Sequence, residues 1–226
     1  MSVCAIMQPT YLPWLGYFDL IRKSDVFVIY DQAQFEKQSW QQRNRIRTKD
    51  GEIMLTVPVL HGKGLERIIA EVELDRHQNA LRKHLNSIRL SYARARNFEL
   101  VFGQLEEIYQ QKHIRLMDLN MELLKWGMRM FKIDTSLIYS SALGYTGTRV
   151  EALLDICRLV KADHYYSPAG SKGYIDENNL FENSGIQLTY QQYQHPVYDQ
   201  IQGGEFISHL SFIDYLFNSP DWNIFA

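Results

Sequence analysis

The chain has 226 residues, of which 46% are hydrophobic and 22% are charged, so it can bury a full core as one soluble globular domain. Its net charge of −2 provides no general attraction for nucleic acid or an anionic membrane, so an anion site must be local. Since no apolar stretch approaches the ~20 residues that span a bilayer and the N-terminus does not resemble a signal peptide, we expect a cytoplasmic protein without a membrane span.

The first residues predict a strand, a stiff loop and an amphipathic helix. Val3–Met7 is a short apolar run, and the loop after it contains Pro9 and Pro13. Two prolines fix φ at two points and remove two N–H donors, which makes the loop rigid. In α/β proteins such a corner forms a ligand site at the end of the first strand, and here Tyr11 and Trp14 would contact the substrate. The alternative is a proline turn that only directs the chain into its helix.

A second apolar strand, Val26–Tyr30, ends at Asp31, which we interpret as an acid–base candidate. The segment that follows, 32–47, is polar and cationic and shows no clean period. Its basic residues are Lys37, Arg43, Arg45 and Arg47. Because they have almost no acidic neighbour in the sequence, they are suited to binding phosphate or carboxylate, although a solvated basic surface is the alternative. A third strand, Ile53–Val57, comes next.

The apolar pattern in the middle of the chain predicts a structural scaffold of helices without a ligand site. Partial alternation predicts a strand over Glu66–Leu74, after a turn at 62–64. Apolar spacing then predicts helices over 75–92, 98–110 and 114–131, and we interpret 75–132 as an α-helical insertion. The histidines of this region are His77, His84 and His113, and we assign them to helix faces rather than to a metal.

The last third predicts a return to α/β alternation, with strands over 136–139, 164–166 and 186–190. Thr148 is the expected cap of a helix over 149–160, with Glu151 completing a capping box. A loop over 167–174 contains glycines, serines and a lysine, so its amides and the dipole of a helix from Asp176 to Phe181 could hold an anion. A structural turn is the alternative.

His195 precedes a proline and lies between tyrosines, which makes it the best acid–base candidate among the seven histidines. Its alternative role is to shape the loop through a backbone hydrogen bond. Ser211 is the expected cap of a last helix, and Asp214 would complete that cap or point into a cleft. Cys4 and Cys157 look like isolated buried thiols, so we expect no zinc site.

Several stretches closely resemble the bacterial WbqC-like family. They are IMQPTYLPWLGYFDLI (6–21), SDVFVIYD (24–31), the spaced pattern QF-K-W-RNRI (34–46), LTVPV (55–59), YSPAGS (166–171), the segment 190–200 and LSFID (210–214). The resemblance spans nearly the whole chain. It implies a role in O-antigen or other surface-polysaccharide biosynthesis, with transfer of an acyl or glycyl group to an amino sugar. Many relatives have His where this chain has Met7, so a mechanism that needs an imidazole there would fail here.

We therefore expect an α/β fold, a mainly parallel sheet flanked by helices with an α-helical insertion at 75–132, forming one domain over 1–226. The candidate catalytic residues are Asp31 and His195, and the candidate substrate-binding residues are Tyr11, Trp14, Lys37, Arg43, Asn44, Arg45, Ser167, Gly170, Lys172 and Tyr198. The expected partner is a phosphorylated or nucleotide-linked sugar, with no nucleic acid and no metal, and the sequence indicates no particular cofactor or oligomeric state.

The expected function is a transferase acting on a nucleotide-linked amino sugar. One alternative is a non-catalytic sugar- or nucleotide-binding accessory protein of the same pathway. Another is a nucleotidylyl transferase of the HxGH type. That alternative is weaker because the loop over 10–16 contains no histidine to stabilise the phosphates.

Overall fold

A computed structural model describes residues 1–60, 67–177 and 179–225, and the chain divides into two compact units. Unit 1 comprises Met1–Gln8, Gly16–Ala33 and Ile133–Gln194. Unit 2 comprises Pro9–Leu15, Gln34–Lys132 and His195–Ala226. The helices predicted over 75–132 belong to unit 2, whereas the single domain over 1–226 stays a prediction. The turn predicted at 62–64 lies outside the described residues.

Unit 1 is built on a five-stranded sheet whose strands are all parallel. The strands are β1 (Val3–Met7), β2 (Val26–Ile29), β5 (Ser136–Tyr139), β6 (His164–Ser167) and β7 (Gln187–Tyr190), and they lie in the order β5-β2-β1-β6-β7. Cys4 of β1 pairs with Val26 on one side and with Tyr165 on the other. The predicted α/β fold with a mainly parallel sheet is confirmed.

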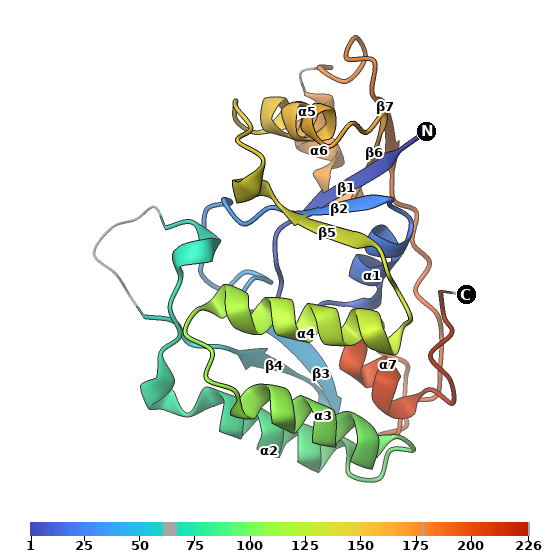
Figure 1. The fold of residues 1–226 in the computed structure, drawn as a ribbon. Helices are drawn as coiled ribbons and strands as arrows, with labels where there is room; N and C mark the ends of the chain where they lie inside the picture. Colours follow the sequence, from blue (N-terminus) through green and yellow to red (C-terminus); the bar gives the residue numbers. More distant parts are fainter. Residues whose placement is uncertain (61–66, 178, 226) are drawn as a thin grey trace. The chain divides into compact units, whose positions relative to one another are not determined.

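Helices cover both faces of this sheet, as Figure 1 shows. Helices α5 (Val150–Leu159) and α6 (Lys172–Asp176) lie on one face, and α1 (Leu15–Arg22) lies on the other. The central strands β1 and β2 are almost entirely apolar because they are buried from both sides, as parallel strands usually are.

The two cysteines share the core between the sheet and α5. Both thiols are free and buried, in a strand and in a helix as predicted. They are not isolated from each other, however. The Cys157 side chain hydrogen-bonds to Cys4 and, together with burial, raises the pKa of the Cys4 thiol. The sequence could not show this contact because it depends on how α5 packs on β1.

Unit 2 combines an antiparallel hairpin with helices. The hairpin pairs β3 (Arg43–Thr48) with β4 (Gly51–Thr56), and the helices are α2 (Ala80–Tyr92), α3 (Phe98–Gln110), α4 (Leu116–Met130) and α7 (Phe212–Asn218). Helix α3 packs against both α2 and α4, and α7 contacts α3 and β3. Stacked rings reinforce the core, with the Tyr92 and Phe217 centroids 4.5 Å apart.

One prediction for the centre of the chain is wrong, and a second is correct only in part. The strand over 66–74 is replaced, within its described part, by the short 3-10 helix η1 (Ile69–Glu71), with single bridges at Ile68 and Leu74. The predicted helix over 75–92 is interrupted. Another 3-10 turn, η2 (Arg76–Gln78), comes first, and Asn79 at φ +49° separates it from α2 because this left-handed conformation cannot continue a helix.

Predictions of the helix ends had mixed outcomes. Ser211 does cap α7, since its hydroxyl accepts the amide of Ile213 at 3.5 Å. Thr148 does not cap α5: Arg149 occupies that position, and no side chain makes the capping hydrogen bond. The helix predicted from Asp176 to Phe181 is also wrong, because helix α6 ends where this one should begin.

None of the helices in the described part of the chain combines the length and the apolar character needed to cross a membrane.

Candidate functional site

The sheet of unit 1 changes direction between β1 and β6. From β1 the chain passes through α1 to β2, whereas from β6 it passes through α6 to β7 on the opposite side. Counted along unit 1, the strands therefore lie in the order 3-2-1-4-5, as in the first five strands of dinucleotide-binding domains. In doubly wound sheets the crevice outside the carboxyl ends of the strands at this point is the ligand site.

A buried polar cluster lies beside this point. The Gln191 amide donates from Nε2 to the Gly16 carbonyl and to Asp19 Oδ2, both at 2.8 Å. Tyr166 also donates to Asp19 Oδ2, at 3.4 Å, and Lys23 pairs with Oδ1 at 2.9 Å. Burial alone would lower the pKa of Lys23, but the hydrogen bond and charge of Asp19 outweigh it and raise that pKa. The cluster joins α1 to the ends of β6 and β7.

Asp31, a predicted catalytic residue, follows β2 and is buried. Its Oδ1 accepts the Ser140 hydroxyl at 2.8 Å and the Ser141 amide at 2.9 Å, and its Oδ2 accepts the Ser141 hydroxyl at 2.6 Å. These three donors explain how a carboxylate can be buried here, because each replaces a hydrogen bond to water. These hydrogen bonds thus hold the loop after β5 in place. Its acid–base role stays a prediction.

Three predicted binding residues lie at the end of β6 or soon after it: Ser167 is the last residue of β6, Gly170 follows in the loop, and Lys172 begins α6. Ser167 is fully buried, and its carbonyl accepts the amide of Gln191 at 2.8 Å. At Gly170 a Cβ atom would meet no heavy atom within 4 Å, so the loop surface is open there. Lys172 is exposed and lies 5.8 Å from the centre of the Tyr190 ring. Since α6 has only five residues, its dipole is small, and anion binding here would depend on the lysine and the loop amides.

In unit 2, three predicted site residues gather around His209. Its ring lies 5.0 Å from the ring of Trp14, nearly parallel to it, and 5.0 Å from the ring of His195. The Arg45 side chain donates from Nη2 to the His209 carbonyl at 3.3 Å. His209 itself adopts φ +58°, a left-handed conformation that is uncommon for residues other than glycine. No motif in the sequence indicated His209, because only the fold brings its loop to Trp14.

The basic residues Arg43, Arg45 and Arg47 occupy alternate positions on β3 and therefore share one face of the hairpin. Arg45 is not without an acidic neighbour. Glu52, on the partner strand, accepts two hydrogen bonds from Arg45 Nη1 at 2.9 and 3.1 Å. The expectation of almost no local acid failed because it counted neighbours along the chain only. The exposed Trp40 ring completes this surface, 5.6 Å from the Arg45 guanidinium.

One other predicted binding residue, Asn44, supports the proline loop. Asn44 is buried and donates from Nδ2 to the carbonyls of Tyr11 and Leu12, at 3.3 and 2.6 Å. Leu12 has φ +44°, so these bonds hold a strained turn. Lys37 lies in the exposed loop before β3. Binding of substrate by Asn44 and Lys37 stays a prediction.

His195, the other predicted catalytic residue, is half-buried. Its Nδ1 lies 2.9 Å from the carbonyl of Pro196 and must carry the proton there, which leaves the lone pair on Nε2. Burial lowers the pKa of His195; the Pro196 carbonyl opposes this shift, and the neighbouring His209 adds to it. A neutral imidazole with a basic Nε2 is the form that a general base requires.

The predicted binding residue Tyr198 is held by Asp214. This fully buried carboxylate accepts the Tyr198 hydroxyl at 2.7 Å, the Gln200 amide at 2.9 Å and the Tyr92 hydroxyl at 2.6 Å. Burial raises the pKa of Asp214, and these three hydrogen bonds and the charge of Arg47 oppose the shift. Asp214 therefore organises the interior of unit 2 and does not complete the cap of α7.

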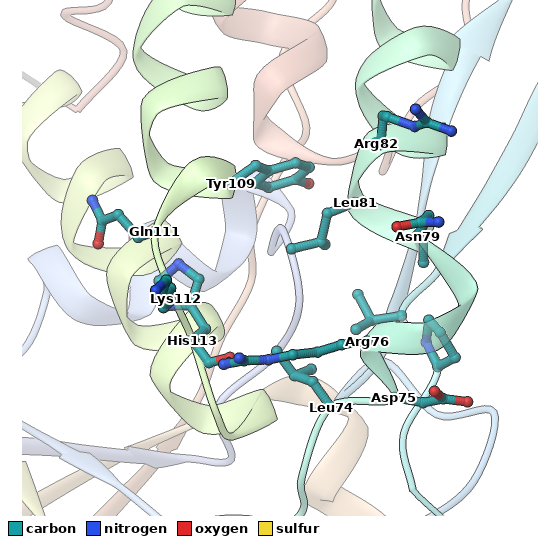
Figure 2. Close-up of a pocket in the computed structure, with 13 residues that line it drawn as sticks. Leu74, Asp75, Arg76, Asn79, Leu81, Arg82, Tyr109, Gln111, Lys112 and His113 are labelled. Carbon is teal, nitrogen blue, oxygen red and sulfur yellow. The ribbon is translucent and has the colours of Figure 1, made fainter.

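Unit 2 also contains a cavity of about 310 Å³, shown in Figure 2. Its lining consists of Val57, Pro58, Leu74, Asp75, Arg76, Asn79, Ala80, Leu81, Arg82, Tyr109, Gln111, Lys112 and His113. None of the predicted site residues lines it. The apolar spacing of this region predicts helical scaffold and does not indicate a cavity.

Tyr11 lies behind this cavity. It is completely buried, and its hydroxyl contacts the hydroxyl of Tyr109 and lies 2.8 Å from His84 Nδ1. His84 Nε2 lies 3.1 Å from the Thr56 carbonyl, so it carries the proton and Nδ1 accepts from Tyr11. Burial lowers the pKa of His84 to about 4, and the Thr56 carbonyl partly opposes this shift. Tyr11 was predicted to bind substrate, and its contacts show that it positions Tyr109. A direct binding role of Tyr11 stays a prediction.

Comparison with known proteins shows the family to which the chain is related. The profile of the WbqC-like protein family matches residues 8–224. The chain belongs to this family. It is also 34% identical over 228 residues to a Mycobacterium tuberculosis (strain ATCC 25618 / H37Rv) protein named "Uncharacterized protein Rv1507c". The alignment covers 98% of this chain and 97% of the relative. No solved structure matches the chain.

The resemblance of this WbqC-like protein to its family, first seen in short motifs, is therefore confirmed over nearly the full chain. The motif residues divide between the units: Asp31, Ser167, Gly170 and Lys172 belong to unit 1, and the other predicted site residues belong to unit 2. Within residues 1–60, 67–177 and 179–225, no three His, Cys, Asp or Glu side chains gather in a way that could hold a metal ion.

Proposed function

We propose that this WbqC-like protein is a transferase of bacterial surface-polysaccharide (O-antigen) biosynthesis that acts on a nucleotide-linked amino sugar. The observation that carries the nucleotide part is the change of direction between β1 and β6 in a parallel sheet. Sheets with this order bind nucleotides outside the carboxyl ends of these strands. The pathway and the amino sugar come from the resemblance of the motifs to those of the family.

The nucleotide site we propose uses the loops after β1 and β6. Gln8 follows β1, and the segment from Ser167 to Lys172 starts at the last residue of β6. Lys172 would contact the phosphates as an exposed cation beside the open surface at Gly170. A lysine serves this purpose well because its ammonium group is a compact charge on a flexible stem.

The chemistry we propose is N-acyl or glycyl transfer. The amino nitrogen of the sugar forms a bond to the acyl carbon, and the bond from that carbon to its carrier, such as a thioester sulfur, breaks. The nitrogen gives up one proton as the amide forms, and a general base must accept this proton. The lowered pKa of His195 suits this task because the imidazole is then neutral near pH 7.

The rings around His209 supply a surface suited to carbohydrate. Trp14 and His195 flank His209, and Trp40 is half exposed at the nearby Arg45. Aromatic faces pack against the apolar C–H faces of sugar rings while polar groups around them bind hydroxyls. This surface supports a sugar substrate whether the protein is catalytic or only binds.

The test begins with a ligand panel. Purified protein is heated with UDP- and dTDP-linked amino sugars, ATP, CoA thioesters and glycine. A ligand at about a hundred times its dissociation constant adds about 2.7 kcal/mol of stability. We expect a raised melting temperature with a nucleotide-linked amino sugar, weakened by Lys172→Ala. Arg158→Ala is the matched control, because the end of α5 precedes β6 and so lies at the amino edge of the sheet.

Turnover decides between enzyme and binding protein. With a bound sugar and an acyl donor, mass spectrometry should detect the acylated sugar. His195→Ala should abolish that product and leave the affinity for the sugar nucleotide within about twofold. A sugar that binds but never gains mass with any donor would instead indicate a non-catalytic accessory protein.

A further inference from the structure

The cavity of unit 2 has the size and lining of a small-molecule site. Its volume of about 310 Å³ lies at the lower end of the ~300–1,000 Å³ typical of ligand pockets. A phosphorylated monosaccharide fits this volume better than a complete nucleotide sugar does. Val57, Leu74 and Leu81 provide an apolar wall, and the ring of Tyr109 lies beside Leu81, as Figure 2 shows.

Three cationic side chains line the same cavity as this apolar wall. Arg76, Arg82 and Lys112 all line the cavity and are exposed. Among the described residues, none of the three approaches a carboxylate within 4 Å. In Figure 2, Arg76 extends across to the segment of His113, whose carbonyl accepts a hydrogen bond from its guanidinium. The cavity therefore has a concentration of positive charge that the net charge of the chain does not reveal.

Among the described residues, the lining contains one carboxylate, and this carboxylate already accepts hydrogen bonds. Asp75 accepts the amide of His77 at 3.1 Å and the side chain of Gln78 at 2.7 Å. These bonds cap η2, so the acid serves the local turn and does not pair with Arg82 or Lys112. An anion entering the cavity would meet more donors than acceptors.

Helix α2 adds backbone donors, because it begins at the cavity. Asn79, Ala80, Leu81 and Arg82 are its cap and first three residues, and all of them line the cavity. The first N–H groups of a helix have no acceptor within the helix, and the Asn79 side chain makes no capping hydrogen bond. At 13 residues, α2 has a dipole that favours an anion at this end.

We propose that this cavity binds a small phosphate monoester, of the class of monosaccharide phosphates. The phosphate group would lie between Arg82, Lys112 and the first amides of α2, and the ring would lie against the apolar wall. Tyr109, fixed from behind by its contact with Tyr11, gives that wall a fixed position. The site belongs to unit 2 and does not depend on the nucleotide site proposed for unit 1.

Isothermal titration of the full chain tests this proposal with glucose 1-phosphate, inorganic phosphate and glucose. We expect glucose 1-phosphate to bind, inorganic phosphate to bind more weakly, and glucose to give no signal. The double variant Arg82→Gln/Lys112→Gln should weaken binding at least tenfold. Lys83→Gln is the matched control, since Lys83 is an exposed cation of the same helix outside the cavity lining, and it should keep native affinity.

Any of three results would overturn the proposal: no binding of glucose 1-phosphate, equal binding of glucose, or unchanged affinity in the double variant. Inorganic phosphate binding as tightly as the ester would refute the monosaccharide class. Lys112→Gln alone, outside any helix, provides the same comparison if the double variant folds poorly. Affinity for a sugar nucleotide should be unchanged by these substitutions, so the failure of either proposal can be recognised separately.

Discussion

His84 shows how one buried side chain connects a sequence motif to a cavity. It accepts the hydroxyl of Tyr11, which in turn contacts Tyr109 in the cavity lining. The sequence pattern predicted correctly that His84 lies on a helix face. It could not reveal the contact with Tyr11, because 73 residues separate the two and only the packing of unit 2 joins them. The substrate role predicted for Tyr11 rested on its place in a motif, not on its surroundings.

The stability of the protein should depend on pH through His84. Its pKa is about 4 in the folded protein and about 6.5 in an unfolded chain. As the pH falls below 6.5, the unfolded state binds the proton first, so the folded state loses up to about 3 kcal/mol by pH 4 and nothing above pH 6.5. Between pH 7 and pH 4.5, the melting temperature should therefore decrease less for His84→Gln than for the native chain.

Asn86→Gln is the control for this comparison, because it changes an exposed position of the same helix without changing a titrating group. It should follow the native pH profile. Parallel pH profiles for the native chain and His84→Gln would show that His84 does not contribute to the acid sensitivity.

At the scale of single elements, the edge strand β5 depends on Asp31. Within the sheet β5 pairs only with β2, and the loop after it is fastened by the Asp31 carboxylate. Hydrogen bonds to charged groups contribute about 1.5–3 kcal/mol each. The double variant Ser140→Ala/Ser141→Ala removes two of them, so the amides of β5 should exchange at least about tenfold faster in hydrogen-exchange experiments.

The opposite edge strand supplies the internal reference. Among the described strands, β7 pairs with β6 alone, and the three hydrogen bonds of Asp31 go to the loop after β5, so the exchange rates of β7 should stay unchanged. Equal acceleration at both edges would indicate a general loss of stability, and no acceleration in β5 would show that the Asp31 contacts do not hold this strand.

The strands β1 and β2 of unit 1 could be predicted because each is a short apolar run between turn residues, as at Val26–Ile29. The segment 66–74 misled the prediction, since alternating apolar residues also suit a 3-10 turn bridged on both sides. Hairpin strand β3 was not predicted as a strand. Its alternate arginines read as a basic surface, because the cross-strand partner Glu52 could not be assigned from the sequence.

At the scale of the whole molecule, the sequence predicted parallel strands but not their order. Hydrophobic runs report burial, whereas the position of β1 between β2 and β6 depends on the handedness of the crossovers. The candidate site shows the same limit. Motifs identified Trp14, Arg45 and His195, whereas His209, which contacts all three, and the cavity of unit 2 follow only from the fold.

The most direct test of the nucleotide-sugar proposal is hydrogen exchange of the whole chain with and without a UDP-linked amino sugar, read by mass spectrometry. We expect slower exchange in peptides that contain Gln8 and the segment from Ser167 to Lys172, because these residues lie at the carboxyl ends of β1 and β6. Protection confined to unit 2, or none at saturating ligand, would contradict a nucleotide site at the carboxyl edge of this sheet.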